Sequence, residues 1–345
     1  MKLKSLAIAA LLATAAPASA QTPIGVSYQP SLYWALPFHY ATVKGWWKEA
    51  GLEPTFSTFP AGAPQIAASA AKSWDVGGTG SVPAVLGAVR FNILTIGIAN
   101  DESKANAMMV RGDKFDAIKA DPKLLKGQRL LLTTNSTVDY ASRKCLVKFG
   151  LAANDMQFVN LGQAQIITAV TSNNGDVAGV WAPNTYPLAE RAGAKTLCSG
   201  ADAGAVVPGA LVVRADYAKE KPGEVAKFLA VYLRGWGWAK ANPAEARKLA
   251  LDFYKTGGLE VSANAMDQEF ATRPTFSLDE QLKLMARAGG PSTADGWFSE
   301  IGKFITETGT IPANPEAKDY LSDDFLKRVA ADAKLKAFAT EFDKK

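Results

Sequence analysis

Histidine and cysteine are scarce in this chain of 345 residues, which has one histidine, His39, and two cysteines, Cys145 and Cys198. A structural zinc site usually needs four Cys or His ligands, and a catalytic one usually needs three protein ligands including His. A Ser-His-Asp triad would have to use His39, which lies in LPFHYATVKGWW, a stretch with helical spacing and an aromatic face. We therefore expect a packing or surface role for His39, and we expect no metal, no cofactor and no enzymatic activity.

A strong charge of one sign is also missing. The formal net charge is +5, and the basic residues are scattered rather than clustered with aromatic residues. Nucleic-acid-binding segments usually concentrate their positive charge. We therefore expect no nucleic-acid partner.

Long apolar runs are limited to the first 20 residues, MKLKSLAIAALLATAAPASA, and no later run approaches the ~18 residues that span a bilayer. The basic start, the apolar stretch and the small residues Ala-Ser-Ala are typical of a secretory signal peptide. We expect the mature protein to begin near Gln21, to be soluble and to lie in the periplasm. In that oxidising compartment Cys145 and Cys198 could form a disulfide, or they could remain two buried thiols.

Strand-like and helix-like segments alternate along the mature chain, which predicts an α/β fold with largely parallel sheets. About 325 mature residues suggest two domains, because single cores stop growing at ~250–300 residues. The alternation restarts after residue 104, and a return strand at 205–214 precedes a mostly helical C-terminal part. We expect residues 21–104 plus 205–345 to form lobe I and residues 105–204 to form lobe II. The other expected strands are 24–28, 52–59, 92–99, 128–134, 156–162, 176–182 and 194–199.

One short stretch, DVGGTGSVPAVLGA at residues 75–88, is unusually rich in small residues where a buried strand should turn into a helix. Glycines at 77–80 would let the backbone approach a ligand closely, and Thr79 and Ser81 would add hydroxyl groups. Ser81 before Val82 and Pro83 also fits a helix N-cap with proline in the first turn. We expect the Gly80–Val82 turn both to cap the helix and to contact a ligand.

Several turns follow the carboxyl ends of expected strands and lead into helices, where ligands of open parallel sheets bind. Helix N-termini present unpaired N–H groups and a partial positive charge, which suit an anion. Aromatic side chains nearby could hold the rest of the molecule. The candidate ligand-binding residues are Tyr28, Trp34, Phe38, Gly62, Ala63, Gly80, Ser81, Val82, Asp101, Thr134, Asn135, Ser136, Thr137, Trp181 and Asn184.

The order and spacing of GTGSVP, TTNSTVDYA, NLGQAQIITAV and GDVAGVWAPNTYPLAE resemble the periplasmic substrate-binding proteins of ABC importers, in the taurine, aliphatic sulfonate and nitrate branch. The resemblance covers nearly the whole mature chain. It implies the type II two-lobe fold, with two crossovers, a ligand cleft between the lobes and an ABC permease in the inner membrane as partner. Taurine and sulfonate members usually have Trp-Asp-Pro where this chain has Trp181, Ala182 and Pro183.

These observations favour a monomeric binding protein for a small organic anion of the sulfonate, carboxylate or nitrate kind. One alternative is an enzyme on the same fold, similar to the thiamine-pyrimidine synthases. The resemblance to those enzymes implies a cysteine-rich and histidine-dependent pattern, which this chain lacks. Another is a binding protein for an amine or aromatic ligand that uses Asp101 and Glu102 of the first crossover as cation receptors. Arg273 could reach the cleft as an anion partner, but a surface position is expected for it.

Overall fold

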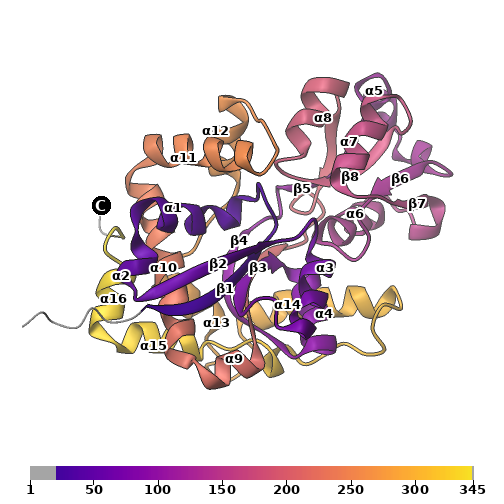
Figure 1. Ribbon diagram of the computed structural model, residues 1–345. Helices are drawn as coiled ribbons and strands as arrows, with labels where there is room; N and C mark the ends of the chain where they lie inside the picture. The colour runs from indigo at the N-terminus through magenta and orange to yellow at the C-terminus, as the bar shows by residue number, and fades with distance from the viewer. Residues whose placement is uncertain (1–20, 344–345) are drawn as a thin grey trace, which may run out of the picture.

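Two five-stranded sheets, each flanked by helices, divide the molecule into two lobes (Figure 1). The computed structural model describes residues 21–343. The predicted signal peptide, residues 1–20, therefore lies outside the described residues. None of the helices described is both long and apolar enough to cross a membrane.

The first sheet has the strand order β2-β1-β3-β10-β4 and is built from chain segments far apart in sequence. β1 pairs in parallel with β2 and β3, whereas β10 runs antiparallel to β3 and β4. The strands are β1 (Thr22–Tyr28), β2 (Leu52–Thr58), β3 (Val76–Gly80), β4 (Ile93–Asp101) and β10 (Pro208–Arg214).

The second sheet has the strand order β7-β6-β8-β5-β9. β6 pairs in parallel with β7 and β8, whereas β5 runs antiparallel to β8 and β9. The strands are β5 (Asn106–Val110), β6 (Arg129–Leu132), β7 (Gln157–Asn160), β8 (Val177–Trp181) and β9 (Lys195–Ser199).

This arrangement confirms the predicted α/β fold with two lobes and two crossovers. Each sheet is largely parallel, with one antiparallel strand, β10 in the first and β5 in the second. The chain crosses between sheets from β4 to β5 and from β9 to β10. β5 and β10 enter their lobes from the cleft side, so they run opposite to the strands that end there. The exact lobe boundaries, 21–104 plus 205–345 and 105–204, stay a prediction.

Helices cover both sheets, and most of those after β10 pack on the first lobe (Figure 1). The stretch LPFHYATVKGWW, whose spacing is helical, forms parts of two helices, because Gly45 takes a left-handed backbone with φ of 76°. The helices before β10 are α1 (Leu36–Lys44), α2 (Trp46–Glu49), α3 (Gly62–Ala68), α4 (Ser81–Phe91), α5 (Gly112–Ala120), α6 (Thr137–Lys148), α7 (Gln163–Thr171) and α8 (Thr185–Ala192).

The helical C-terminal part agrees with the sequence-based expectation. It contributes eight α-helices within the described residues, and α10 is the longest of them and is buried along most of its length. These helices are α9 (Ala215–Glu220), α10 (Pro222–Ala241), α11 (Pro243–Thr256), α12 (Ala263–Thr272), α13 (Leu278–Met285), α14 (Thr293–Glu307), α15 (Asp324–Ala331) and α16 (Ala333–Ala339).

The second lobe is fastened internally by a disulfide between Cys145 of α6 and Cys198 of β9, with their Cα atoms 6.0 Å apart. This decides between the two alternatives that the sequence left open. Both cysteines belong to the apolar cluster on one face of the second sheet, which also contains Leu130 and Val177. The bond therefore ties the helix whose first turn faces the cleft to the sheet beneath it.

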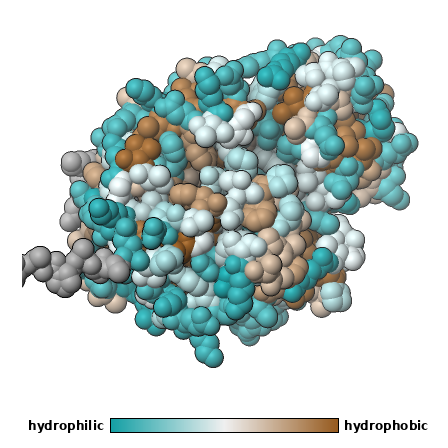
Figure 2. All heavy atoms as spheres, viewed as in Figure 1, coloured by the Kyte–Doolittle hydropathy of each residue, from teal (hydrophilic) through white to brown (hydrophobic). Residues whose placement is uncertain are grey.

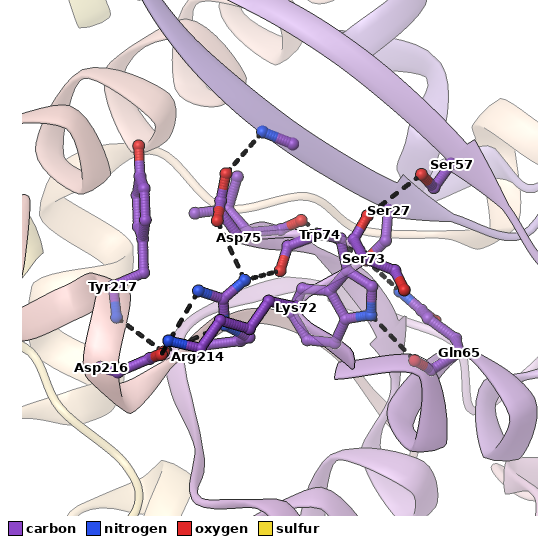
Figure 3. Close-up of polar contacts among 12 residues, drawn as sticks. Ser27, Ser57, Gln65, Lys72, Ser73, Trp74, Asp75, Arg214, Asp216 and Tyr217 are labelled. Atoms are coloured by element: carbon purple, nitrogen blue, oxygen red, sulfur yellow. Dashed lines mark hydrogen bonds and ion pairs between the residues drawn. The ribbon is translucent and has the colours of Figure 1, made fainter. Parts of the chain in front are cut away.

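Figure 3 shows how the start of β3 is held in the first lobe. The guanidinium of Arg214 lies 3.0 Å from Asp75 Oδ1 and 3.0 Å from Asp216 Oδ1, and it also donates to the Trp74 carbonyl. The indole N–H of Trp74 donates to the Gln65 carbonyl at 2.9 Å. These bonds join β3, β10 and α3 into one frame, so the turns at the ends of β3 and before α3 keep a fixed spacing.

Candidate functional site

A cavity of about 40 Å³ lies between the lobes, near the carboxyl ends of β1, β3, β4, β6 and β8. One water molecule needs ~10–15 Å³ of such space, so the cavity has room for a few waters and a larger ligand needs a wider cleft. The atoms of the two lobes meet along their boundary (Figure 2). The residues lining the cavity are Gln29, Leu32, Trp34, Ala61, Gly62, Ala63, Gly80, Pro83, Glu102, Thr133, Thr134, Asn135, Ser136, Thr137 and Trp181.

The structure brings nine of the fifteen predicted site residues together around this cavity. Whether they contact a ligand stays a prediction. Those nine are Trp34, Gly62, Ala63, Gly80, Thr134, Asn135, Ser136, Thr137 and Trp181. The six that do not line it are Tyr28, Phe38, Ser81, Val82, Asp101 and Asn184. Five further lining residues were not named as site residues from the sequence: Gln29, Leu32, Ala61, Pro83 and Thr133. The last lining residue, Glu102, was named only in the alternative of an amine or aromatic ligand.

Tyr28 and Phe38 line a different hollow, on the outer side of the first lobe. The ring of Tyr28 lies 6.0 Å from that of Phe38 and 6.0 Å from that of Phe253. His39 lines the same hollow, with its ring 5.4 Å from Phe253. Tyr28 is the last residue of β1, and neighbouring strand residues point to opposite faces of a sheet. The next residue, Gln29, reaches the cavity instead.

Within the 77–80 stretch, Gly77 and Gly78 do not line the cavity and serve packing, whereas Gly80 lines it. They lie within β3, and a Cβ on Gly77 would be 2.3 Å from the Ser27 carbonyl oxygen. A Cβ on Gly78 would be 2.3 Å from Cζ3 of Trp34, the aromatic residue that lines the cavity. The missing side chain at 78 therefore makes room for the indole that forms one cavity wall.

Two helices of the opposing lobes begin at the cavity. In α4 the N-cap is Gly80, one residue earlier than expected, and Ser81 is the first helical residue. The hydroxyl of Ser81 is buried without a hydrogen-bond partner, so it does not cap the helix. In α6 the N-cap is Ser136, whose hydroxyl accepts from the Asp139 N–H at 3.4 Å. First-turn N–H groups have no partner within their own helix.

Some of the predicted hydrogen-bond donors already have partners within the protein. The backbone N–H of Thr134 donates to Asn160 Oδ1 at 3.0 Å, and that of Asn135 donates to Asp139 Oδ2 at 3.0 Å. The side-chain oxygen of Asn135 accepts from the Thr310 hydroxyl at 2.9 Å, across the lobe boundary. These bonds shape the turn before α6 and leave the first turn of the helix itself to face the cavity.

Gln29 is held in the cavity wall by a chain of amides. Its side-chain amide donates to the side-chain oxygen of Gln65, which is fully buried. The Gln65 amide in turn donates to Ser27 Oγ at 2.8 Å and to the Gly78 carbonyl at 2.9 Å. This network fixes which end of the Gln29 amide faces inward.

Arg273 is 2% exposed rather than on the surface, which corrects the expectation from sequence. Its Nη2 lies 3.2 Å from Glu269 Oε1 and donates to the Ala182 carbonyl of the other lobe at 2.6 Å. Glu269 also accepts from the hydroxyls of Tyr254 at 2.6 Å and Tyr186 at 2.8 Å. Tyr186 belongs to α8 of the second lobe, so this buried cluster joins the two lobes behind the cavity.

Glu102 lies between this cluster and the cavity, with Oε1 3.9 Å from Nη1 of Arg273. Burial raises the pKa of Glu102 from 4.5 to about 7, against the opposing effect of Arg273. Asp101 is turned away and accepts from the backbone N–H of Ser103 at 2.8 Å. Of these two acids Glu102 is the one that lines the cavity, while Asp101 shapes the crossover.

Three comparisons place this architecture among known proteins. A family model described as NMT1/THI5 like matches residues 34–246. A protein of Bacillus subtilis (strain 168) named "Putative aliphatic sulfonates-binding protein" is 30% identical over 297 residues, which are 85% of this chain and 84% of that protein. The taurine-binding periplasmic protein of Escherichia coli (strain K12) is 29% identical, over 79% of this chain and 82% of its own.

The fold itself is similar to a solved structure. The alkanesulfonate-binding protein SsuA from Xanthomonas axonopodis pv. citri, bound to MOPS, superimposes with a TM-score of 0.72. The match covers 88% of this chain and 99% of that one, at 19% sequence identity. At that identity the likeness shows the shared two-lobe fold.

Proposed function

Because this chain belongs to the NMT1/THI5-like family, whose model matches more than half of it, we propose that it is an extracytoplasmic solute-binding protein. It captures a small organic anion, of the sulfonate, carboxylate or nitrate kind, and delivers it to an ABC permease. Relatives named for aliphatic sulfonates and for taurine, which cover about four-fifths of the chain or more, support the solute-binding role.

The observation that supports an anionic ligand is that two helices begin at the same cavity. Gly80 and Pro83 bring the first turn of α4 to it, and Ser136 and Thr137 bring that of α6. Both helices exceed ten residues, and their unpaired N–H groups and dipoles favour negative charge at these ends. Hydrogen bonds to an ionised group are worth about 1.5–3 kcal/mol each, so three or four offset the desolvation of one sulfonate or carboxylate.

The cavity also has one aromatic wall from each lobe, Trp34 from the first and Trp181 from the second. A ligand that contacts both indoles interacts better with the closed lobes than with separated ones. Binding then shifts the population toward the closed form. A permease can distinguish the loaded protein by this closure.

The enzyme alternative fits the chemistry of the chain less well. Its one histidine, His39, lines the outer hollow beside Phe253 rather than the cavity. Its two cysteines, Cys145 and Cys198, are bonded to each other in the core of the second lobe. A nucleophile–base pair at the cavity would have to be built from other residue types.

The decisive experiment is a ligand screen on the purified mature protein. Thermal shift and calorimetry are run with alkanesulfonates, nitrate, short carboxylates, aromatic acids and simple alkylamines. A true ligand stabilises by RT ln(1 + [L]/Kd), about 2.7 kcal/mol at a hundred times Kd. We expect stabilisation by at least one anion-bearing compound. Stabilisation by simple amines alone, or turnover of a bound compound into product, contradicts the proposal.

The cellular part of the proposal needs its own measurement. We expect the protein in the periplasmic fraction and as a monomer by light scattering. Reconstituted with its cognate ABC permease, the ligand-loaded protein should stimulate ATP hydrolysis more than the empty protein. A cytoplasmic location, or equal stimulation by both forms, contradicts the delivery role.

A further inference from the structure

Glu102 is the charged side chain of the cavity lining, and its charge is not balanced by its surroundings. Only 8% of the side chain is exposed, and Glu102 is one of the residues that line the cavity. Among the described residues the nearest cation is Arg273, at 3.9 Å, which is too far for a hydrogen bond. Asn100 lies near enough to favour the ionised carboxylate, yet its own buried side-chain atoms have no partner within hydrogen-bond distance.

The positive charge of Arg273 is already committed to another acid. Glu269 lies closer to the guanidinium, at 3.2 Å, and is itself fully buried. The hydroxyls of Tyr186 and Tyr254 also donate to the Glu269 carboxyl. One buried cation and one buried anion therefore cancel, and an ionised Glu102 adds a net negative charge at the edge of the cavity. Buried charges are normally paired.

We propose that Glu102 receives a protonated amine of the ligand, which makes the ligand a small zwitterion. This inference rests on the proposed function and narrows its ligand class. The anionic end lies at the first turns of α4 and α6, and the ammonium group donates to the Glu102 carboxylate. Short amino-sulfonates and amino-carboxylates have this chemistry.

The acid at the cavity comes from a different element than the aspartate of the Trp-Asp-Pro pattern would. The Trp-Asp-Pro aspartate is replaced by Ala182, whose carbonyl accepts from Arg273. Glu102 follows the end of β4 and lines the same cavity as Trp181. An ammonium group beside Glu102 also lies within a cavity walled by two indoles, whose faces attract cations.

The opposite assumption, a simple anion beside Glu102, has a measurable consequence. The charged groups that act on Glu102 are Arg273, Glu269 and Asp101, and two of these three are acids. A simple anion in the cavity would therefore require Glu102 to take up a proton on binding. The affinity for a simple anion would fall about tenfold for each pH unit above 7. The affinity for a zwitterion would stay the same or increase over the same range.

The test uses two probes of nearly equal shape, 2-aminoethanesulfonate and propane-1-sulfonate, which differ by an ammonium in place of a methyl group. Calorimetry at pH 8 compares the unaltered protein with Glu102→Gln, and Asp101→Asn serves as the control because Asp101 does not line the cavity. We expect the unaltered protein to prefer the amino-sulfonate at least tenfold. Glu102→Gln should remove that preference, and Asp101→Asn should keep it.

The outcomes separate this inference from the proposed function. Equal binding of both probes, or a preference for propane-1-sulfonate, overturns the assignment of Glu102 while the anion site stands. A preference that survives Glu102→Gln overturns it as well. If no anion-bearing compound of the wider screen binds, the proposed function is contradicted, and the inference about Glu102 falls with it. Matched thermal unfolding of the variants without ligand shows that a lost preference does not arise from misfolding.

Discussion

Gly80 and Thr137 face each other across the cleft, one from each lobe, so closely that a Cβ on Gly80 would lie 2.7 Å from Cγ2 of Thr137. Thr is β-branched and stiff in a helix, so it has little freedom to move away. The closed arrangement of the lobes therefore depends on the absence of a side chain at position 80.

We expect Gly80→Ala to hold the lobes apart and to weaken ligand binding at least tenfold. Small-angle scattering should give a larger radius of gyration for the ligand-saturated variant than for the unaltered protein. Gly223→Ala is the matched control, since a Cβ there meets nothing within 4 Å. Adding Thr137→Ser to Gly80→Ala removes Cγ2 and should restore closure; unchanged closure in Gly80→Ala alone would contradict this account.

The hydroxyls at the two helix starts should differ in their effect on binding. Thr137 lines the cavity, so Thr137→Ala should weaken anion binding about tenfold, the effect of losing ~1.4 kcal/mol. Ser81 does not line it, and its buried hydroxyl has no partner. Ser81→Ala should leave the affinity unchanged and should not lower stability, because it removes an unsatisfied polar group. Calorimetry and urea unfolding of both variants check this, and equal losses of affinity would disprove it.

Stability of the ligand-free protein should depend on pH through Glu102. Its pKa is about 7 in the folded protein against an ordinary value of 4.5. Below pH 4.5 the carboxyl is protonated in both states, so its favourable contribution is fully present there. Between pH 4.5 and 7 the unfolded chain loses this proton while the folded protein keeps it. The free energy of unfolding therefore falls as pH rises, by roughly 3 kcal/mol at pH 8.

Urea unfolding of the unaltered protein and of Glu102→Gln, at pH 5, 6, 7 and 8, isolates this dependence from the other titrating groups. As pH rises, we expect the free energy of unfolding of the variant to increase relative to that of the unaltered protein. A difference between the two that stays constant with pH would show that Glu102 does not titrate in this range.

Removal of the disulfide should lower stability without altering specificity. The bond between Cys145 and Cys198 closes a loop with a sequence separation of 53 residues, for which chain entropy gives about 4 kcal/mol. Neither cysteine lines the cavity. The double variant Cys145→Ala/Cys198→Ala should unfold at lower urea and keep the ligand preference of the unaltered protein. A changed preference would mean that the bond also sets the position of α6.

The parts of the site that could be predicted from sequence are those fixed by local chain geometry. Turns at strand ends are marked by their small and polar residues, which is why Gly62, Gly80 and Thr137 were identified and do line the cavity. Which way a side chain leaves the turn is set by the pleat of the strand before it. Tyr28 and Gln29 are neighbours in the chain, and it is Gln29, not the aromatic Tyr28, that lines the cavity.

The parts that could not be predicted depend on contacts between distant segments. Arg273 and Glu102 are 171 positions apart in the chain, and only the packing of α12 against both lobes brings them together. A lone arginine beside a proline has no local pattern that indicates burial. The pairing of Cys145 with Cys198 is of the same kind, since spacing does not reveal the distance between two Cα atoms.

Gly78 has a consequence for how the specificity of such a cleft can change. It lies inside a sheet, behind Trp34, and its missing side chain determines where that indole rests. A larger residue at 78 would push the indole forward and reshape the cavity without any ligand-lining residue being replaced. Which ligands this scaffold can bind therefore depends partly on residues packed behind the cavity lining. Substitutions there can alter recognition while every lining residue stays the same.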